Sequence, residues 1–150
     1  MQTFLPHPSF EESALVLDSR RLGKQIIEGR QIWRAAQPGA GGWANHPATR
    51  MWRPWTDALV RYTLAMSLEW LTRYGRVHGA WTNLLRIDLG HEIPAARQTV
   101  MPPWLGDDRL HSSHRAALLA KKPDHYGCFG WTETPAVDYW WPVAPAKANR

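Results

Sequence analysis

Cysteine is almost missing from this sequence. Cys128 is the only one, so an internal disulfide cannot form and a zinc site built from several cysteines is excluded. No uninterrupted apolar run approaches the length that crosses a bilayer, and residues 1–10 lack the charged segment and apolar stretch of an export signal. We therefore expect a protein of the reducing cytoplasm that has no membrane partner.

Signals for β-structure and for common cofactors are also missing. The sequence shows no sustained strand alternation, no internal repeat and no low-complexity block. It has no Ser-His-Asp motif, no phosphate-binding loop and no dinucleotide fingerprint, so we expect no cofactor and no metal. A length of 150 residues with 44% hydrophobic composition suits one globular domain over residues 1–150.

Helix signals dominate the first half of the chain. Ser9 followed by Glu12 is a capping box, which predicts a helix from about Phe10. Asp18 either caps a second helix or lies inside one long helix, which ends in the proline and glycines of "AAQPGAGG" at 35–42. A further helical region is predicted from Asn45 to Trp70, interrupted or restarted at Pro54.

The second half is predicted to hold one more main helix. It runs from Asp107 to Lys122 and is stopped by Pro123. Residues 75–104 have no sustained period and are expected to form a long loop with a short helix near 82–89. Residues 124–145 are rich in aromatic residues and proline and should wrap irregularly over the helices. The predicted fold is thus all-α, with about three main helices, long loops and an aromatic C-terminal tail.

Helical spacing also predicts the core. At about 100° per residue, one face of the opening helical stretch is apolar, and a second apolar stripe follows after Pro54. We expect Trp33, Trp55 and Trp70 to lie in the core. For Trp52, which lies between Arg50 and Arg53, the sequence does not decide between the core and the surface. The two predicted core faces contain Leu15, Leu22, Ile26, Gly29 and Trp33, and Trp55, Leu59, Tyr62, Met66 and Trp70.

Acidic residues are scarce in one part of a basic chain. The net charge is +5 and the isoelectric point is near 9.8, which suggests an anionic partner. Between residues 19 and 56 there is one acid, Glu28, against seven cations. This distribution favours nucleic acid as the partner, because cations concentrated in one segment suit phosphate contacts. The seven cations are Arg20, Arg21, Lys24, Arg30, Arg34, Arg50 and Arg53.

Glu28 has two interpretations. It shares a helix sector with Arg21, Lys24 and Gln25, so it is expected to project from the basic, polar side and not from the core. It either forms an ion pair with Lys24 one turn away, or it stands where phosphates and a sugar approach and does chemistry there. The residue pattern leaves both open.

Several motifs in order resemble one family. "RRLGKQIIEGRQI" is followed by "NHPATRMW", then "WLGDDRLHSSHRAALLAKKPDHYG" and a closing "DYWWP". Over roughly residues 3–142 these are similar to the pyrimidine-dimer DNA glycosylase (endonuclease V-like) family. The resemblance implies a compact all-α fold that bends double-stranded DNA, displaces a nucleotide and cleaves its glycosidic bond, followed by a lyase step at the abasic site. It also implies that the catalytic acid of the first long helix is Glu28.

The chemistry of such a reaction favours a terminal amine as nucleophile. An α-amino group, with an ordinary pKa of about 7.7–8.0, is neutral more often at physiological pH than lysine at about 10.4. The resemblance implies a nucleophilic N-terminal threonine, whereas this sequence opens Met-Gln-Thr. Because Gln2 is bulky, we expect Met1 to be retained and to supply the amine, with water as the alternative nucleophile of a monofunctional glycosylase.

The remaining candidate residues are assigned to DNA. His46, before Pro47, either points its ring toward a phosphate or displaced base or caps a helix. His111 and His114 are spaced for two metal ligands, but no third ligand follows at a convincing spacing, and phosphate contact or packing are the other readings. The predicted DNA-binding residues are Arg20, Arg21, Lys24, Gln25, His46, Arg50, Arg53, His114, Arg115, Lys121, Lys122 and Tyr126.

Two function classes follow from the sequence. The first is a cofactor-free DNA glycosylase for a pyrimidine dimer, with a damaged pyrimidine or a modified base of foreign DNA as alternative substrates. The second is a noncatalytic DNA-binding protein of the same fold, and an RNA-directed hydrolase is a weaker third reading. No obligate protein partner is evident, and the protein is expected to be cytoplasmic and associated with the nucleoid when bound to DNA.

Overall fold

Short polar side chains start three of the helices at the predicted places. The computed structural model describes residues 1–144. The backbone N–H of Glu12 donates to Ser9 Oγ at 3.1 Å at the start of α1 (Phe10–Val16), and Asp18 accepts from the N–H of Arg21 at 3.4 Å at the start of α2 (Ser19–Ala35). Asp107 caps α6 (Asp108–Lys121) in the same way. Asp18 therefore begins a second helix.

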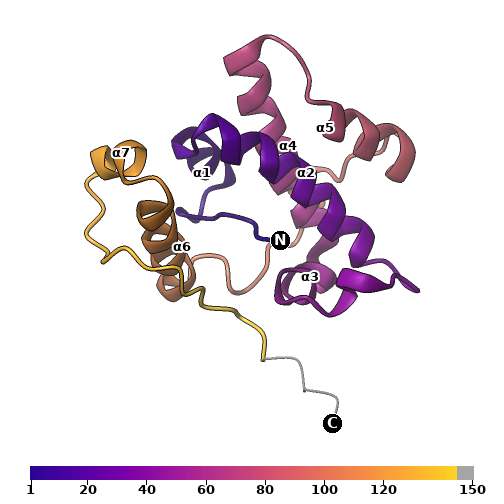
Figure 1. The fold of residues 1–150 in the computed structure, drawn as a ribbon. Coiled ribbons are helices and arrows are strands. Elements are labelled where there is room, and N and C mark those ends of the chain that lie inside the picture. The colour runs from indigo at the N-terminus through magenta and orange to yellow at the C-terminus, as the bar shows by residue number, and fades with distance from the viewer. Residues whose placement is uncertain (145–150) are drawn as a thin grey trace.

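Helices make up the regular structure of residues 1–144, where no strand occurs, so the all-α prediction is confirmed (Figure 1). The remaining α-helices are α3 (Pro47–Trp52), α4 (Thr56–Tyr74), α5 (Gly79–Asn83) and α7 (Pro123–Tyr126). Short 3₁₀ turns are η1 (Gly42–Asn45), η2 (Arg53–Trp55), η4 (Ala96–Gln98) and η5 (Gly127–Phe129), and η3 (Leu84–Asp88) is a π-turn. No helix among these residues is long and apolar enough to cross a membrane.

The helix after Pro54 packs closely on α2. Gly29 lies against α4, and a Cβ atom at this position would lie 2.2 Å from Thr63 Oγ1. One and a half turns earlier, a Cβ on Gly23 would lie 2.8 Å from the ring of Trp70. The two glycines therefore let α2 and α4 approach more closely than any side chain allows, which buries Leu22, Ile26, Leu59 and Met66 between them.

Two core predictions are corrected by the structure. Leu15 is 62% exposed, because Leu17 and Asp18 adopt extended backbone conformations that end α1 and start α2 in a new direction. A single helical wheel therefore does not continue through this stretch. Trp33, Trp55 and Trp70 are only partly buried at the rim of the core. Trp52 is instead fully buried; its ring meets that of Trp104 edge to face at 4.9 Å.

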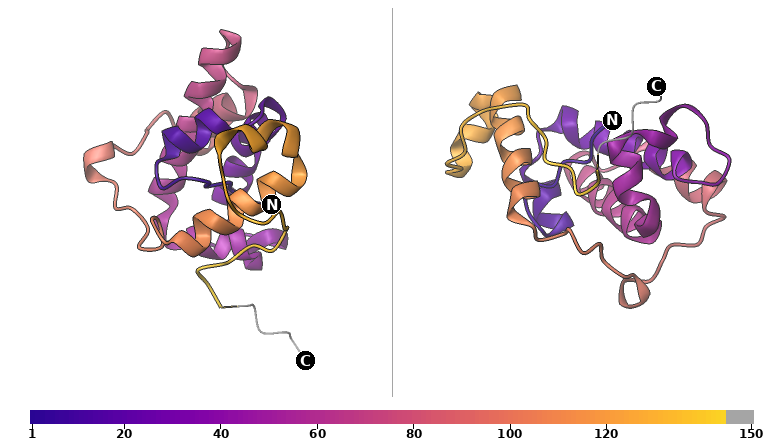
Figure 2. Two further views of the ribbon diagram at one scale, coloured as in Figure 1. Left: turned by 90° about the vertical axis from the view of Figure 1, so that its left-hand side faces the viewer. Right: turned by 90° about the horizontal axis from the view of Figure 1, so that it is seen from below.

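The N-terminal segment passes between two parts of the molecule. In Figures 1 and 2, α6 and α7 lie on one side of this segment, and α2 and α3 lie on the other. The C-terminal tail runs from α7 back across α6 toward the chain start (Figures 1 and 2). Its predicted irregular course over the helices is present after η5, but residues 124–126 belong to α7, and residue 145 lies outside the described residues. Tyr139 of this tail packs on Phe4 with ring centroids 6.2 Å apart. The N-terminus is thereby brought beside α2, where the single acid of the basic segment lies.

Candidate active site

The first six residues, here called the N-terminal arm (residues 1–6), are held on one side by α2 and α4. The backbone N–H of Gln2 donates to Glu28 Oε2 at 3.0 Å, and the N–H of Phe4 donates to Gln25 Oε1 at 2.8 Å. The hydroxyl of Tyr62 donates to the same Gln25 oxygen at 2.7 Å. The amides of an extended segment need acceptors when buried, and two side chains of α2 supply them.

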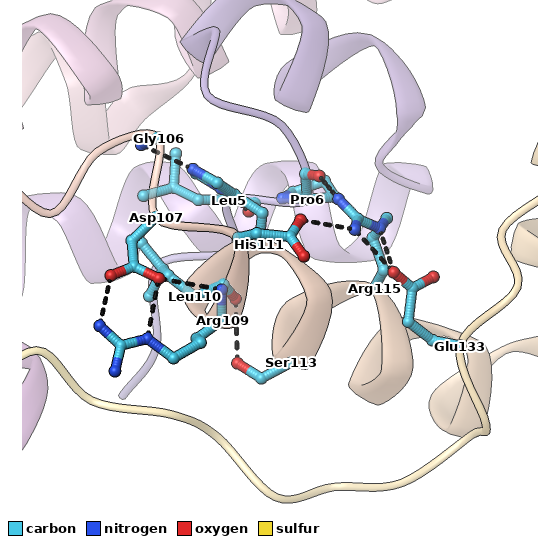
Figure 3. Close-up of polar contacts among 11 residues, drawn as sticks. Leu5, Pro6, Gly106, Asp107, Arg109, Leu110, His111, Ser113, Arg115 and Glu133 are labelled. Atoms are coloured by element: carbon cyan, nitrogen blue, oxygen red, sulfur yellow. Dashed lines mark hydrogen bonds and ion pairs between the residues drawn. The ribbon is translucent and has the colours of Figure 1, made fainter.

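The other side of the N-terminal arm is held by α6. The N–H of Leu5 donates to His114 Nδ1 at 2.9 Å, and the carbonyl of Leu5 lies 2.8 Å from His111 Nδ1. Because His111 Nε2 accepts from the N–H of Gly106 at 2.9 Å, His111 Nδ1 carries the proton and donates to Leu5 (Figure 3). Two histidines one turn apart therefore bind both polar groups of one residue.

His111 and His114 are both neutral. Burial lowers the pKa of His114 to about 3, and burial also lowers the pKa of His111 below its ordinary value. Among residues 1–144, no group of three or more His, Cys, Asp or Glu side chains is placed to hold a metal ion. Packing, the third reading of the His-x-x-His motif, is the role that the structure shows for this pair.

Four side chains that were predicted to contact DNA form hydrogen bonds within the protein instead. Gln25 and His114 are buried under the N-terminal arm, and buried Tyr126 donates from its hydroxyl to the carboxylate of Asp18. Arg115 binds Glu133 through Nε at 2.7 Å and the carbonyl of Pro6 through Nη1 at 2.9 Å (Figure 3). Because Gln25, His114 and Tyr126 are buried and Arg115 is bound to Glu133 and Pro6, we do not propose these four side chains as DNA contacts.

A basic cleft opens where the N-terminal arm meets α2. Its volume is about 400 Å³. Arg20, Arg21 and Lys24 enter it from α2, and Lys121 enters it from the end of α6. The structure thus brings together cations that are about a hundred residues apart in the sequence. The other lining residues are Met1, Gln2, Phe4, Glu28 and Tyr139.

Glu28 lines this cleft but is less exposed than its helix sector suggests. Its side chain is 9% exposed because the N-terminal arm covers it. Glu28 Oε1 lies 3.6 Å from Lys24 Nζ, so the predicted ion pair is present, while 65% of the Lys24 side chain remains exposed. Pairing and a place in the cleft are therefore compatible, and because the lysine remains so exposed the pair adds little to stability.

Comparison with known protein families identifies the chain. A family model described as pyrimidine dimer DNA glycosylase matches residues 1–83, more than half of the chain. The chain belongs to the pyrimidine dimer DNA glycosylase family. No curated protein and no solved structure gives a significant match. The matched region contains Met1, Glu28 and the cations of α2, so the cleft of this family member lies largely within the part that defines the family.

His46 of this DNA glycosylase lies close to the chain start. Its Nδ1 accepts from the N–H of Ala48 at 3.1 Å, so His46 caps α3 as one of its two readings predicted. Burial lowers the pKa of His46, the positive N-terminus lowers it further, and the carboxylate of Glu28 acts in the opposite direction. The charges of the N-terminal amine and of Glu28 therefore both act on the pKa of His46.

The other predicted cations lie outside the cleft lining. Arg50 donates through Nη1 to the carbonyl of Ala144 at 2.6 Å, and Arg53 donates through Nη2 to the carbonyl of Ala44. Lys122 follows α6 and is partly buried. Sequence reasoning missed Tyr139, which reaches the cleft from the C-terminal tail. The closing "DYWWP" motif was the signal available, but no spacing rule connects a tail residue to a site on α2.

The arrangement suits proton transfer beside an amine. The α-amino group belongs to the residue before the amide that donates to Glu28, and Met1 and Glu28 both line the cleft. A carboxylate in the same cleft as an attacking amine can accept a proton and stabilise positive charge on a sugar. The surrounding cations offset the charge of the phosphates that must approach Glu28.

Proposed function

We propose that this family member excises pyrimidine dimers from double-stranded DNA and then cleaves the strand, with the α-amine of Met1 as nucleophile. The observation that carries the proposal is the hydrogen bond from the N–H of Gln2 to Glu28, inside a cleft that also contains Met1 and four cations. An acid and a terminal amine are thus presented together to an anionic polymer. The family membership supplies the substrate class.

In the proposed reaction, the lone pair of the Met1 amine attacks C1′ of the target deoxyribose. The C1′–N bond breaks, and the pyrimidine takes the electron pair and a proton. It leaves this sugar but stays joined through the cyclobutane ring to the second pyrimidine of the dimer. The nitrogen then loses one of its protons, and the ring oxygen leaves C1′ and takes up a proton, which gives an iminium ion. Loss of a proton from C2′ expels the 3′ phosphate. Glu28 receives and returns the protons and stabilises the cationic sugar.

The cations position the DNA. Arg20, Arg21, Lys24 and Lys121 line the cleft and are proposed to bind the phosphates around the target nucleotide. His46, Arg50, Arg53 and Lys122 are proposed to extend this contact along the backbone. A target base inside a duplex is out of reach of a buried carboxylate, so the nucleotide must be displaced from the stack before reaction.

Borohydride trapping tests this proposal. A duplex containing one cyclobutane pyrimidine dimer is incubated with the purified protein, with and without borohydride, beside an undamaged duplex. We expect strand cleavage only of the damaged duplex and a covalent adduct that mass spectrometry maps to Met1. The Lys24→Ala and Lys121→Ala variants are the controls, because both lysines line the cleft. Each variant should bind DNA more weakly, but the adduct should still form and map to Met1.

Each other result changes the proposal in a defined way. Abasic sites without an adduct replace the amine by water and make the protein a monofunctional glycosylase. Product from duplexes with modified bases, but not from the dimer, changes the substrate. Absence of product from every damaged duplex, together with retained DNA binding, contradicts the enzyme and favours the noncatalytic binder.

A further inference from the structure

Trp43 is the most exposed aromatic side chain of residues 1–144. It lies in η1, between α2 and α3, and is 59% exposed. The turn that carries it is well held, because the N–H of His46 donates to the carbonyl of Trp43 at 3.0 Å and Arg53 donates to the carbonyl of Ala44. Gly42, just before it, has a φ of 55°, which a side chain would disfavour. The indole of Trp43 is therefore exposed to solvent on a turn that is held by hydrogen bonds.

A row of aromatic rings connects Trp43 to the cleft. The rings of Trp43 and His46 pack edge to face with centroids 5.5 Å apart, and those of His46 and Trp141 do so with centroids 6.1 Å apart. Trp141 in turn meets Tyr139 at 5.9 Å, and Tyr139 lines the cleft beside Glu28. Trp43 thus stands at the outer end of a continuous aromatic surface, here called the aromatic row (Trp43, His46, Trp141 and Tyr139), that begins at the proposed reaction site.

The surroundings of Trp43 are cationic. Arg50 and Arg53 follow on α3 and η2, and each donates to a backbone carbonyl but has no carboxylate partner within residues 1–144. Their charges are therefore not neutralised by the protein there. Exposed aromatic faces beside uncompensated arginines are how proteins bind unpaired nucleotides, because the rings stack on bases while the cations bind phosphates.

We propose that Trp43 is a stacking platform for a nucleobase displaced from the duplex beside the target nucleotide. The inference rests on the proposed function, since DNA must occupy the cleft for a neighbouring base to reach the outer end of the aromatic row. A displaced base no longer stacks on its neighbours in the duplex, and the indole of Trp43 stacks on it instead. Trp43 therefore favours damaged or abasic DNA, in which a base unstacks readily, over intact duplex.

The test measures DNA affinity by fluorescence anisotropy. The probes are a duplex with a tetrahydrofuran abasic analogue, which resists the lyase step, and the same duplex without it. We expect Trp43→Ala to weaken binding to the abasic duplex by roughly 5- to 150-fold, as for other base-stacking aromatics. Binding to intact duplex should be unchanged, and Trp43→Phe should retain most of the affinity. Tyr74→Ala, at the end of α4, is the matched control because Tyr74 is 42% exposed and does not line the cleft.

A second readout reports the base itself. With 2-aminopurine next to the abasic analogue in the same strand, stacking on an indole quenches its fluorescence, so the complex with Trp43→Ala should be brighter than the wild-type complex. Equal affinity and equal brightness for Trp43→Ala and wild type overturn the inference. Thermal unfolding of each variant shows that the comparison is between folded proteins.

Parallel cleavage of the dimer duplex by the wild-type protein separates the two proposals. Product formation with binding that does not depend on Trp43 overturns the stacking platform alone. Binding that depends on Trp43, without any product, supports the platform and contradicts the enzyme. Failure of the wild-type protein to bind any of these duplexes overturns both.

Discussion

Glu28 Oε2 accepts a hydrogen bond from the backbone N–H of Gln2 at 3.0 Å, which joins the only acid of a basic segment to the start of the chain. A carboxylate among cations is expected to be held by one of them, and Lys24 does lie 3.6 Å from it. An ion pair with Lys24 accounts for the charge of Glu28 but not for its hydrogen bond with the backbone of Gln2. It places Glu28 beneath the N-terminal arm, next to the proposed nucleophile.

Glu28→Gln is expected to remove activity and keep DNA binding. The amide retains an oxygen that accepts from Gln2, so the N-terminal arm should stay in place, but it can no longer accept a proton. We expect cleavage of the dimer duplex to slow by roughly 10²- to 10⁴-fold, the usual contribution of a general acid or base. Affinity for the abasic duplex should be equal or tighter, because a negative charge leaves the cleft.

The control for this prediction is Glu69→Gln. Glu69 pairs with Arg73 at 2.7 Å on α4 and does not line the cleft, so its loss should leave cleavage unchanged. Single-turnover rates and anisotropy titrations on the same duplexes give both quantities. A Glu28→Gln protein that still cleaves at the wild-type rate contradicts a catalytic role for this residue.

Adding one glycine before Met1 is expected to abolish the borohydride adduct. Side chains hold the N-terminal arm from Gln2 to Pro6, so an added residue cannot be absorbed by sliding the arm. The new amine lies up to about 3.8 Å farther along the chain, which is enough to misplace an attacking group. Trapping efficiency and DNA affinity are compared with wild type. Undiminished trapping at the new terminus means that the amine is not positioned by the arm.

Lys121→Ala is expected to weaken binding to damaged and intact duplexes alike. Lys121 is exposed at the end of α6 and is the cation that α6 contributes to the cleft lining. Loss of one phosphate contact should reduce the slope of log K against log salt by about 0.9. Arg86→Ala is the control, because Arg86 is exposed in η3, away from the cleft. An unchanged slope for Lys121→Ala contradicts its assignment to phosphate.

Helix boundaries were the most predictable part of this structure, because they depend on local signals. Ser9, Asp18 and Asp107 begin their helices through hydrogen bonds to amides two or three residues ahead, which a sequence pattern records directly. The concentration of cations on α2 was equally visible, and Arg20, Arg21 and Lys24 do meet in one cleft. The other two cations of α2, Arg30 and Arg34, instead pair with Asp88. Glu28 was singled out by its charge and by the family resemblance, and it does line the cleft.

Contacts between distant segments were not predictable. A helical wheel placed Gln25 on the polar side, but it could not show that an extended arm from the chain start covers that side and takes its amide oxygen. His114 lies 109 positions from the Leu5 amide that it accepts from, and no periodic pattern spans that distance. Gln25 and His114, which the sequence pattern assigns to DNA, instead accept hydrogen bonds from the protein's own backbone, because burying an extended segment requires acceptors for its amides.

Gly29→Ala is expected to destabilise the fold despite the higher helix propensity of alanine. Its Cβ would lie 2.2 Å from Thr63 Oγ1 and 3.0 Å from Thr63 Cγ2. Overpacking of this kind costs about 1–3 kcal/mol. Gly79→Ala, where nothing lies within 4 Å of the new Cβ, is the control and should be neutral or stabilising. Urea unfolding measures each variant.

Thr63→Ala should partly rescue Gly29→Ala, because it removes the two nearest atoms, and the nearest remaining one is Thr63 Cβ at 3.2 Å. The double-mutant cycle then gives a favourable coupling free energy between the two positions. Additive effects of the two substitutions contradict a direct clash between α2 and α4 at this point.

His114 is expected to make the protein less stable in acid. Burial lowers the pKa of His114 to about 3 in the folded protein, against 6.5 for an ordinary histidine. As the pH falls below that ordinary value, the unfolded chain takes up a proton and the folded one does not. The stability contributed by neutral His114 is therefore complete above the ordinary pKa and declines between it and the folded value, by about 1.4 kcal/mol per pH unit.

His114→Asn tests this origin of the acid sensitivity. Asparagine can place an oxygen near the position of Nδ1 and still accept from the N–H of Leu5, but it does not titrate. The variant should lose stability at neutral pH, because the side chain is smaller and leaves space in the core, yet its free energy of unfolding should fall less steeply as the pH drops. Some slope remains, since burial also lowers the pKa of His111. Urea unfolding at a series of pH values from neutral to acidic gives the slope for both proteins, and identical slopes would exclude His114 as the group that titrates on unfolding.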